Sequence, residues 1–450
     1  MTSSDRELSE RPSMEALLYQ ALKEGVLPIT SVCNMGCVFC SNRYNPKSCE
    51  VFSIGPRDLE DIEETIPWLQ GAPGAIVIGE SVTRINEGEP LTHPHFMTIV
   101  EKVRDAYPEK PIRVTTNASL LSPEKSRRLA SLGVELIISL NTVGKRKEVM
   151  ADPEPEVTLR NVSALNGVIK LEGSIVALPF VTGWDDLRET CRFLKDSGAI
   201  SIRLLAPGFS AAHPLFKEMP SSTWEECRRF AGEMTRALGI PVLFEPPVLR
   251  DLCARVEAVM EGTPAKAAGM RAGDIITRVA GIQVDSRKDA FELARERENP
   301  KITLLRDGGQ IEVALAKPRR TSPGFVVYED LDLRAFSAWA ARAGFGRKAP
   351  PLILTSSLAR PLISAALESR GLEAQVVTVR SRYFGGNIQA GGLLTVGDFL
   401  AAYNNALRDL KPPSTVTLPK RAFDAWGRDL EGVSYKRFTE ETGCQVVLAG

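Results

Sequence analysis

The first half of the chain alternates short apolar runs with amphipathic stretches. Apolar side chains recur at helical spacing at Trp224, Cys227, Phe230 and Met234, for example. Nearly continuous apolar strands separated by such helices are typical of a parallel sheet covered on both faces. We therefore predict an α/β fold whose core, residues 1–248, is a partial TIM-like (β/α)6 barrel. The six predicted strands are 27–32, 75–79, 112–116, 136–140, 174–178 and 201–205.

The pattern changes near residue 250. Residues 249–320 read as short strands, one helix and a final hairpin, whose turn at Asp307-Gly308-Gly309 lies between two alternating strands. Strand and helix units return after residue 320, where Thr395-x2-Asp398 has the pattern of a helix capping box. We therefore predict a small β-rich domain over 249–320 and a C-terminal α/β domain over 321–450.

Length and charge narrow the class of protein. A chain of 450 residues is long enough for two to four domains. Lys plus Arg and Asp plus Glu number 56 each, so no net field favours nucleic acid as a partner. The N-terminal segment is polar, and no apolar run is long enough to cross a bilayer. We therefore expect a cytoplasmic protein with neither nucleic acid nor a membrane as partner.

Three of the eight cysteines crowd together as Cys33-x3-Cys37-x2-Cys40, directly after the first predicted strand. This spacing places three thiolates on a loop at the carboxyl end of the sheet, where α/β folds assemble their sites. Iron–sulfur clusters normally take four thiolates, so a trio leaves one iron open for another ligand. The alternative is a zinc site, which needs a fourth ligand such as His93 or His95 from a distant loop.

This spacing, with the aromatic Phe39 directly before Cys40, resembles the hallmark of the radical S-adenosylmethionine (SAM) superfamily. The resemblance implies that Cys33, Cys37 and Cys40 hold a four-iron, four-sulfur cluster. It further implies that SAM chelates the open iron and is cleaved by one electron to methionine and a 5′-deoxyadenosyl radical. That radical abstracts hydrogen from a substrate, which the sequence does not identify and which is a small molecule or a peptide. The low potential required implies ferredoxin or flavodoxin as electron donor.

Two later motifs resemble cofactor-binding segments of the same superfamily. Gly88-Glu89-Pro90 resembles the end of a Gly-Gly-Glu-Pro motif whose backbone and carboxylate receive the SAM amino group, with Glu87 in place of the first glycine. The third strand ends in Thr115-Thr116-Asn117-Ala118, which is similar to the Thr-Asn-Gly of radical SAM relatives, and the fourth ends in Ser139-Leu140-Asn141. Polar side chains at the carboxyl ends of barrel strands point into the site, where we expect them to bind the SAM carboxylate and ribose. Two of them, Asn117 and Asn141, equally fit a role in capping turns. The predicted cofactor-binding residues are Phe39, Gly88, Glu89, Pro90, Thr116, Asn117, Ser139 and Asn141.

The other cysteines and histidines carry weaker signals. The remaining five cysteines lack C-x2-C spacing, so no auxiliary cluster is indicated. Cys191 and Cys227 lie on apolar helix faces, where core packing is the better interpretation. His93 and His95 flank a proline at a helix start and fit solvated or capping roles.

The two downstream regions also resemble known modules. The stretch from Gly262 to Ile276 resembles the core of a PDZ domain, which binds extended peptides, although no Gly-Leu-Gly-Phe-like loop precedes it. Residues 383–388 and 392–395 resemble the tail of a radical SAM family that also carries a PDZ-like module and has no assigned substrate. The alternative to an enzyme is an iron–sulfur scaffold protein that uses these two domains without turning over SAM. Methyl transfer through cobalamin lacks its Asp-x-His-x2-Gly signal.

Overall fold

The computed structural model describes residues 12–40, 43–80, 84–345, 350–408, 413 and 415–450. Contacts between Cα atoms divide the chain into two compact units. The first comprises residues 1–209, 213–238 and 242–245, and the second comprises 210–212, 239–241 and 246–450.

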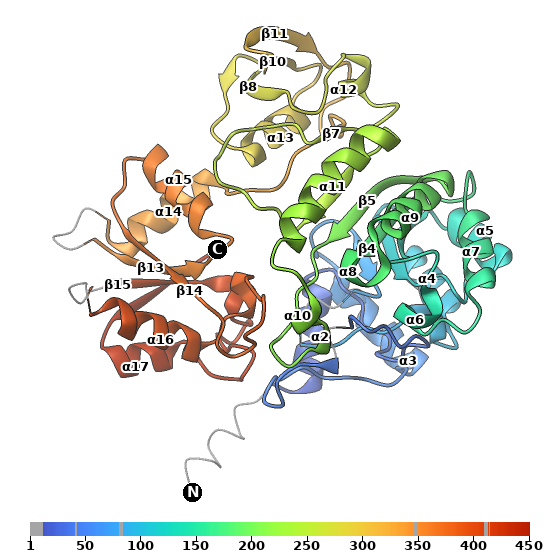
Figure 1. The fold of residues 1–450 in the computed structure, drawn as a ribbon, viewed down its shortest axis with the longest axis horizontal. Coiled ribbons are helices and arrows are strands. Elements are labelled where there is room, and N and C mark those ends of the chain that lie inside the picture. Colours follow the sequence, from blue (N-terminus) through green and yellow to red (C-terminus); the bar gives the residue numbers. More distant parts are fainter. Residues whose placement is uncertain (1–11, 41–42, 81–83, 346–349, 409–412, 414) are drawn as a thin grey trace, which may run out of the picture. The chain divides into compact units, whose positions relative to one another are not determined.

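The first unit is built on one six-stranded sheet (Figure 1). Every neighbouring pair is parallel, and the strands follow one another in sequence order from β1 to β6. This arrangement confirms the predicted partial barrel. The strands are β1 (Ile76–Ile78), β2 (Ile112–Thr116), β3 (Val134–Ser139), β4 (Leu171–Val176), β5 (Ala199–Leu205) and β6 (Val242–Glu245).

The sheet differs from the prediction at both ends. Residues 27–32 do not form a strand. They follow an isolated bridge between Val26 and Val77, and Ser31 bonds instead to Ile54, which lies in a loop. At the other end, β6 was not predicted because its run is short and is followed at once by two prolines. The sheet therefore keeps six strands with a different first and last member.

Helices cover the sheet, and their caps follow the local sequence. Ser122 accepts a hydrogen bond from the Lys125 amide at the start of α5, with Pro123 in the first turn, as predicted. Cys227, Phe230 and Met234 are buried on α11. The helices are α2 (Met14–Lys23), α3 (Leu59–Thr65), η2 (Ile66–Leu69), η3 (Pro90–Thr92), α4 (Phe96–Ala106), α5 (Pro123–Ser131), α6 (Arg146–Met150), α7 (Pro155–Ser163), α8 (Pro179–Thr182), α9 (Trp184–Asp196), α10 (Pro214–Glu218) and α11 (Thr223–Leu238).

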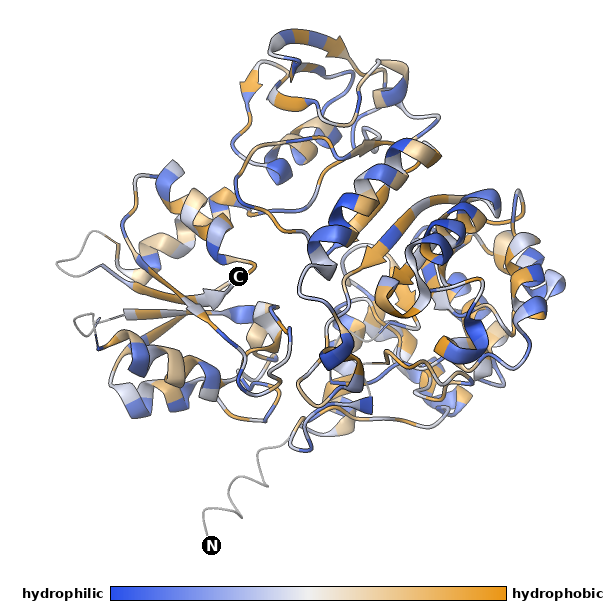
Figure 2. Cartoon of the chain, in the orientation of Figure 1, coloured by the Kyte–Doolittle hydropathy of each residue, from blue (hydrophilic) through white to orange (hydrophobic). Residues whose placement is uncertain are grey.

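The two faces of the barrel sheet differ in polarity. Side chains such as Ile112, Val114 and Leu204 are fully buried on one face, and Figure 2 shows the apolar colouring of β5 beside the two-toned α11. The alternate positions are half-buried and carry ion pairs, as between Arg113 and Glu172 at 2.6 Å. This second face of the sheet is therefore more polar than expected for a parallel sheet covered by helices on both sides.

The second unit begins with a small β-rich domain. Asp307 and Gly308 form its turn and both have positive φ, 49° and 79°. The hairpin predicted at Asp307-Gly308-Gly309 is therefore confirmed, with Gly309 as the first residue of β11 rather than part of the turn. Beyond residue 320, the predicted end of this domain, Phe325 still pairs with β7 and belongs to its core. The elements are β7 (Ala258–Val259), α12 (Pro264–Ala267), β8 (Ile275–Val279), β9 (Ile282–Gln283), α13 (Arg287–Glu296), β10 (Lys301–Arg306), β11 (Gly309–Ala314) and β12 (Phe325–Val326).

The rest of the second unit is a four-stranded parallel sheet in the order β14-β13-β15-β16 with helices packed against it. The predicted capping box is confirmed: Thr395 and Asp398 bond to each other's backbone amide at the start of α16. The elements are α14 (Leu333–Ala343), β13 (Leu352–Ser356), α15 (Arg360–Ser369), β14 (Gln375–Val379), η4 (Gly391–Leu393), α16 (Val396–Ala406), β15 (Thr415–Pro419), η5 (Lys420–Ala422), α17 (Lys436–Thr442) and β16 (Gln445–Ala449).

Within the described residues, no helix combines the length and apolar character needed to cross a membrane.

Close packing of α9 on the sheet gives a test of the barrel core. A Cβ at Gly173, in β4, would stand 2.7 Å from Leu194 Cδ1 and 3.2 Å from Ile202 Cγ1. Gly173→Val should therefore lower the free energy of unfolding by about 1–3 kcal/mol through overpacking, measured by urea denaturation. Gly55→Val, where nothing lies within 4 Å of the added Cβ, is the matched control. Equal stability of the two variants would contradict close packing at Gly173.

Candidate cluster and cofactor site

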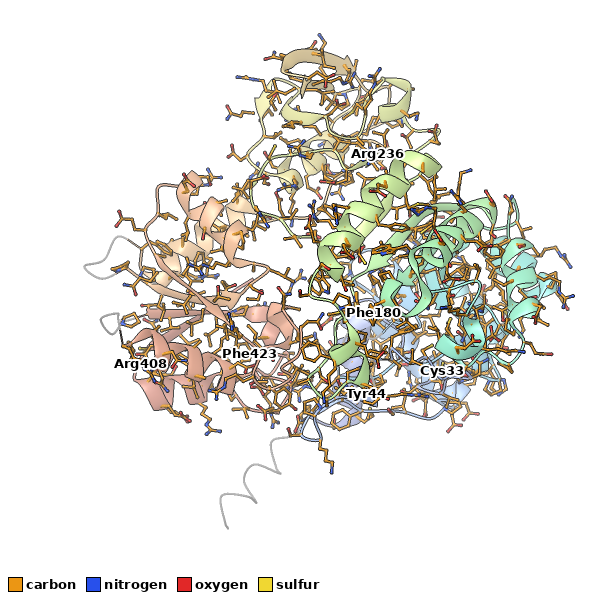
Figure 3. The ribbon with its side chains drawn as sticks, viewed as in Figure 1. Cys33, Tyr44, Phe180, Arg236, Arg408 and Phe423 are labelled. Atoms are coloured by element: carbon orange, nitrogen blue, oxygen red, sulfur yellow. The ribbon has the colours of Figure 1, made fainter. Side chains whose placement is uncertain are left out.

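The cysteine loop lies in the barrel unit, where Cys33 is labelled in Figure 3. Its backbone is anchored to the end of α6 by two hydrogen bonds. The Gly36 amide donates to Met150 O at 2.9 Å, and the Val38 amide donates to Val149 O at 2.8 Å. Both donors lie inside the loop between Cys33 and Cys40. The segment after β3 therefore holds the cysteine loop in place.

The three thiols are close enough to affect one another electrostatically. Burial, followed by the charges of Cys33 and Cys40, raises the pKa of Cys37 to about 12. Burial also raises the pKa of Cys33, although this residue is the most exposed of the three. Thiols with raised pKa values become thiolates only when a cation replaces their protons. Three mutually close soft donors on one loop therefore fit an iron–sulfur cluster.

Phe39 anchors the same loop through apolar packing. Its ring packs, with Cys37 and Val38, against a buried cluster of Val149, Met150, Leu178 and Phe209. The ring of Phe209 in turn stacks on the buried His213, with centroids 4.2 Å apart. The aromatic residue of the motif thus holds the loop against the barrel wall. Direct contact of Phe39 with SAM stays a prediction.

The turn at Gly88 lies against the residues that precede Cys33. The Gly88 amide donates to Thr30 O and the Glu89 amide donates to Val32 O, both at 2.9 Å. A Cβ at position 88 would lie 2.1 Å from Val32 O, so only glycine allows this approach. Pro90 follows at the first position of η3. The predicted SAM turn and the cysteine loop therefore adjoin each other.

Glu89 uses its carboxylate inside the chain. Oε1 accepts from Thr116 Oγ1 at 2.7 Å and from the Leu91 amide at 3.2 Å, and Oε2 accepts from the Asn117 amide at 2.7 Å. Burial raises the pKa of this carboxyl, while the three donors favour its charged form. Both oxygens are thus engaged by the chain. Glu89 ties the Gly88 turn to the end of β2, a task that the sequence motif does not reveal.

The amide of Asn117 reaches the cysteine loop. Its Nδ2 donates to Asn34 Oδ1 at 3.0 Å, and Asn34 Nδ2 donates to Ser119 Oγ at 2.8 Å. Ser119 closes the network by donating to Asn117 Oδ1 from both its amide and its hydroxyl. Asn34 and Ser119 were not predicted, because no spacing rule singles out an asparagine next to a cysteine. The end of β2 is therefore bonded to the residue after Cys33.

Asn141 has a structural place at the end of β3. Its φ is +62°, its Oδ1 accepts from the Val176 amide at 2.7 Å, and its Nδ2 donates to Ser139 Oγ at 3.3 Å. The same Nδ2 lies 3.8 Å from Met150 Sδ. These contacts fit the turn-capping interpretation and link β3, β4 and the support for the cysteine loop. Contact of Ser139 or Asn141 with SAM stays a prediction.

His93 is engaged through both ring nitrogens. Nε2 lies 2.8 Å from Arg57 O, and Nδ1 accepts from the His95 amide at 3.1 Å, so Nε2 carries the proton and donates. Burial lowers the pKa of His93, which favours the neutral ring. A zinc site recruiting His93 would have to break these bonds. Among the residues that the structure describes, no three His, Cys, Asp or Glu side chains form a group that could hold a single metal ion.

Other predicted residues also find their places. Cys191 and Cys227 are fully buried, as expected for core cysteines. Glu87, which stands where the family pattern has glycine, has its carboxyl oxygens buried. Burial raises the pKa of Glu87 to about 9, against smaller opposing effects of the Ile29 backbone and Arg57. This carboxyl is therefore neutral at pH 7.

This raised pKa predicts a pH-dependent stability. Between pH 4.5 and 9 the folded chain holds a proton on Glu87 that the unfolded chain has lost, so stability falls as pH rises. The free energy of unfolding should fall by up to about 1.4 kcal/mol for each pH unit in this range. Glu87→Gln removes the titrating group, so it should stabilise the protein more at pH 8 than at pH 5. Urea denaturation at both pH values measures it, with the exposed Glu64→Gln as control. A gain of equal size at both pH values would count against the buried neutral acid.

Comparison with known proteins gives two family matches. Residues 27–194 match the model of the radical SAM superfamily, and residues 255–306 match that of a PDZ domain. A curated relative is the tungsten-containing aldehyde ferredoxin oxidoreductase cofactor-modifying protein of Pyrococcus furiosus. It is 31% identical over 113 residues, which are 25% of this chain and 28% of the relative. The chain thus spans less than a third of that relative's length.

Similar solved structures match about half of the chain. SuiB of Streptococcus suis, bound to its precursor peptide SuiA, is 15% identical with a TM-score of 0.38, over 49% of this chain and 47% of SuiB. anSMEcpe with bound AdoMet is 16% identical with a TM-score of 0.35, over 49% of this chain and 62% of anSMEcpe.

The radical SAM match includes the cysteine loop, the Gly88 turn and the ends of β2 and β3, and hydrogen bonds join these segments into one site. The chain therefore carries a radical SAM domain, the catalytic domain of an enzyme superfamily whose cofactors are a four-iron, four-sulfur cluster and SAM, together with a PDZ domain.

Proposed function

We propose that the chain is a radical SAM enzyme in which Cys33, Cys37 and Cys40 hold the cluster. When bound, the cluster supplies one electron that cleaves SAM and yields a 5′-deoxyadenosyl radical, which abstracts hydrogen from the substrate. The observation that carries this proposal is the bond from Asn117 to Asn34, because it joins the predicted SAM residues to the cysteine loop. An isolated zinc knot would need no such link.

The remaining residues of the site would act by positioning. Gly88 would present backbone carbonyl groups to the SAM amine at a place where a side chain does not fit. Glu89 would hold that turn through Thr116 and the Asn117 amide rather than bind SAM itself. Pro90 would fix the direction in which the chain leaves the turn. Ser139 and Asn141, which bond to each other at the end of β3, would bind the SAM carboxylate and ribose.

The partners follow from the chemistry. The cysteine loop is exposed at Cys33 and Asn34, which supports electron delivery there from a low-potential ferredoxin or flavodoxin in a reducing cytoplasm. A small molecule or a peptide would be the substrate. The PDZ domain favours a peptide, because such domains bind extended chains by strand addition.

Anaerobic reconstitution tests this function. Wild-type protein should bind about four irons per chain and form 5′-deoxyadenosine when dithionite and SAM are added. Cys37→Ala should lose most of the iron and all of the product, because two thiolates do not hold the cube. Iron analysis and chromatography of the products measure both effects.

The matched control is Cys253→Ala, a half-buried cysteine in the second unit, which should keep both the iron and the product. Wild-type protein that holds zinc, or that holds the cluster but forms no 5′-deoxyadenosine, would refute the enzyme proposal. The second outcome would point to a scaffold that works through its PDZ and C-terminal domains.

A further inference from the structure

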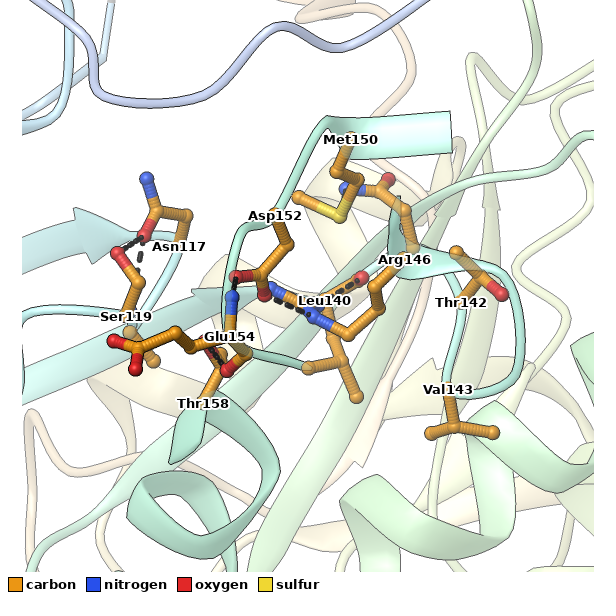
Figure 4. A network of polar contacts seen from close by, with 12 residues as sticks. Asn117, Ser119, Leu140, Thr142, Val143, Arg146, Met150, Asp152, Glu154 and Thr158 are labelled. Atoms are coloured by element: carbon orange, nitrogen blue, oxygen red, sulfur yellow. Dashed lines mark hydrogen bonds and ion pairs between the residues drawn. The ribbon is translucent and has the colours of Figure 1, made fainter. Parts of the chain in front are cut away.

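A buried ion pair lies behind the cysteine loop. Arg146 Nε donates to Asp152 Oδ2 at 2.7 Å, and the side chains are 0% and 1% exposed. Arg146 NH1 also donates to Leu140 O at 2.8 Å, and Asp152 Oδ1 accepts from the Glu154 amide at 3.1 Å. Figure 4 shows the guanidinium between the Leu140 carbonyl and the Asp152 carboxylate. The pair is thus fully enclosed in protein.

Stability alone does not account for this pair. Removing two charges from water costs several kcal/mol per ion, and well-packed apolar residues of similar volume are often equally or more stable. In addition, Arg146 NH2 is buried and has no hydrogen-bond partner among the residues that the structure describes. A buried guanidinium with an unused donor has capacity for a further negative charge.

The pair lies next to the cluster ligands. Arg146 is the first residue of α6, whose last two carbonyl groups, of Val149 and Met150, bind the amides of Val38 and Gly36. Arg146 also acts electrostatically on Cys37, where it favours the thiolate. One five-residue helix therefore carries both the buried guanidinium and the two carbonyl groups that hold the cysteine loop.

We infer that Arg146 is a positioning residue for the cluster: its buried charge stabilises the thiolate-bound cube and raises the cube's reduction potential. This inference rests on the proposed function only for the identity of the bound group. A cube held by three thiolates is negatively charged, and reduction adds one more negative charge. A cation in a low-dielectric surrounding stabilises the reduced form more than the oxidised form. Asp152 and the Leu140 carbonyl orient the guanidinium.

Three variants separate charge from packing. Arg146→Gln with Asp152→Asn removes both charges but keeps side chains that can bond to each other. Arg146→Lys keeps the charge. Arg128→Gln with Glu101→Gln removes an exposed pair, 55% and 36% exposed, and is the matched control. The measurements are iron and sulfide content and the midpoint potential of the cluster, titrated anaerobically and followed by electron paramagnetic resonance.

The inference predicts a more negative midpoint potential in the Arg146→Gln/Asp152→Asn protein, with unchanged potentials in Arg146→Lys and the exposed-pair control. The inference is equally supported if the double variant folds without binding a cluster while the Arg146→Lys protein still binds one. A double variant with the wild-type potential overturns it, and so does an Arg146→Lys protein that shifts as far or loses the cluster.

If the double variant does not fold, Arg146→Met with Asp152→Leu takes its place, because apolar side chains then fill the space of the buried ion pair. The same outcomes for the midpoint potential and the cluster content support or overturn the inference. Wild-type protein without an iron–sulfur signal would contradict the proposed function instead. The two failures are therefore distinguishable.

Discussion

Two backbone hydrogen bonds, from Gly36 to Met150 and from Val38 to Val149, fix the cysteine loop to the segment after β3. The rest of the site depends on them, because a loop of eight residues with three thiols has no regular structure of its own. The end of β2 reaches the same loop through Asn117 and Asn34. The Gly88 turn reaches its base through Thr30 and Val32. The end of α6, the end of β2 and the Gly88 turn, which are far apart in sequence, therefore jointly fix the cysteine loop and the residues before it.

A buried carboxylate in this site has a structural role rather than a ligand-binding one. Glu89 is almost fully buried, and an isolated carboxylate there would be costly. Three donors offset part of that cost, and all three belong to η3 or to the end of β2. The carboxylate consequently links the Gly88 turn to the end of β2. At Glu87, two residues earlier, the effect of burial outweighs the opposing effects of its neighbours, and the carboxyl responds by holding its proton.

Local signals in the sequence were sufficient for features that depend on neighbouring residues. The hairpin at Asp307-Gly308, the cap at Ser122 and the capping box at Thr395 each need only a few adjacent side chains, and each forms as predicted. The proposed metal ligands could be recognised for the same reason, since their spacing is short. Pairings between distant segments could not. Residues 27–32 have a strand-like composition, but Leu27 bonds to Val77 in β1 whereas Ser31 bonds to Ile54 in a loop. Phe325 pairs with β7 from more than 60 residues away.

Arg146 was overlooked for a different reason, since both of its partners lie only six residues away in sequence. In sequence it stands in Gly144-Lys145-Arg146-Lys147, which reads as an exposed basic turn, yet its side chain is fully buried. Only the fold brings Asp152 and Leu140 O around it. Among the described residues its ion-pair partner is Asp152, and one terminal nitrogen of the guanidinium is buried without a hydrogen-bond partner. A negatively charged cube would be attracted by this guanidinium, so cluster binding and folding of this region would stabilise each other.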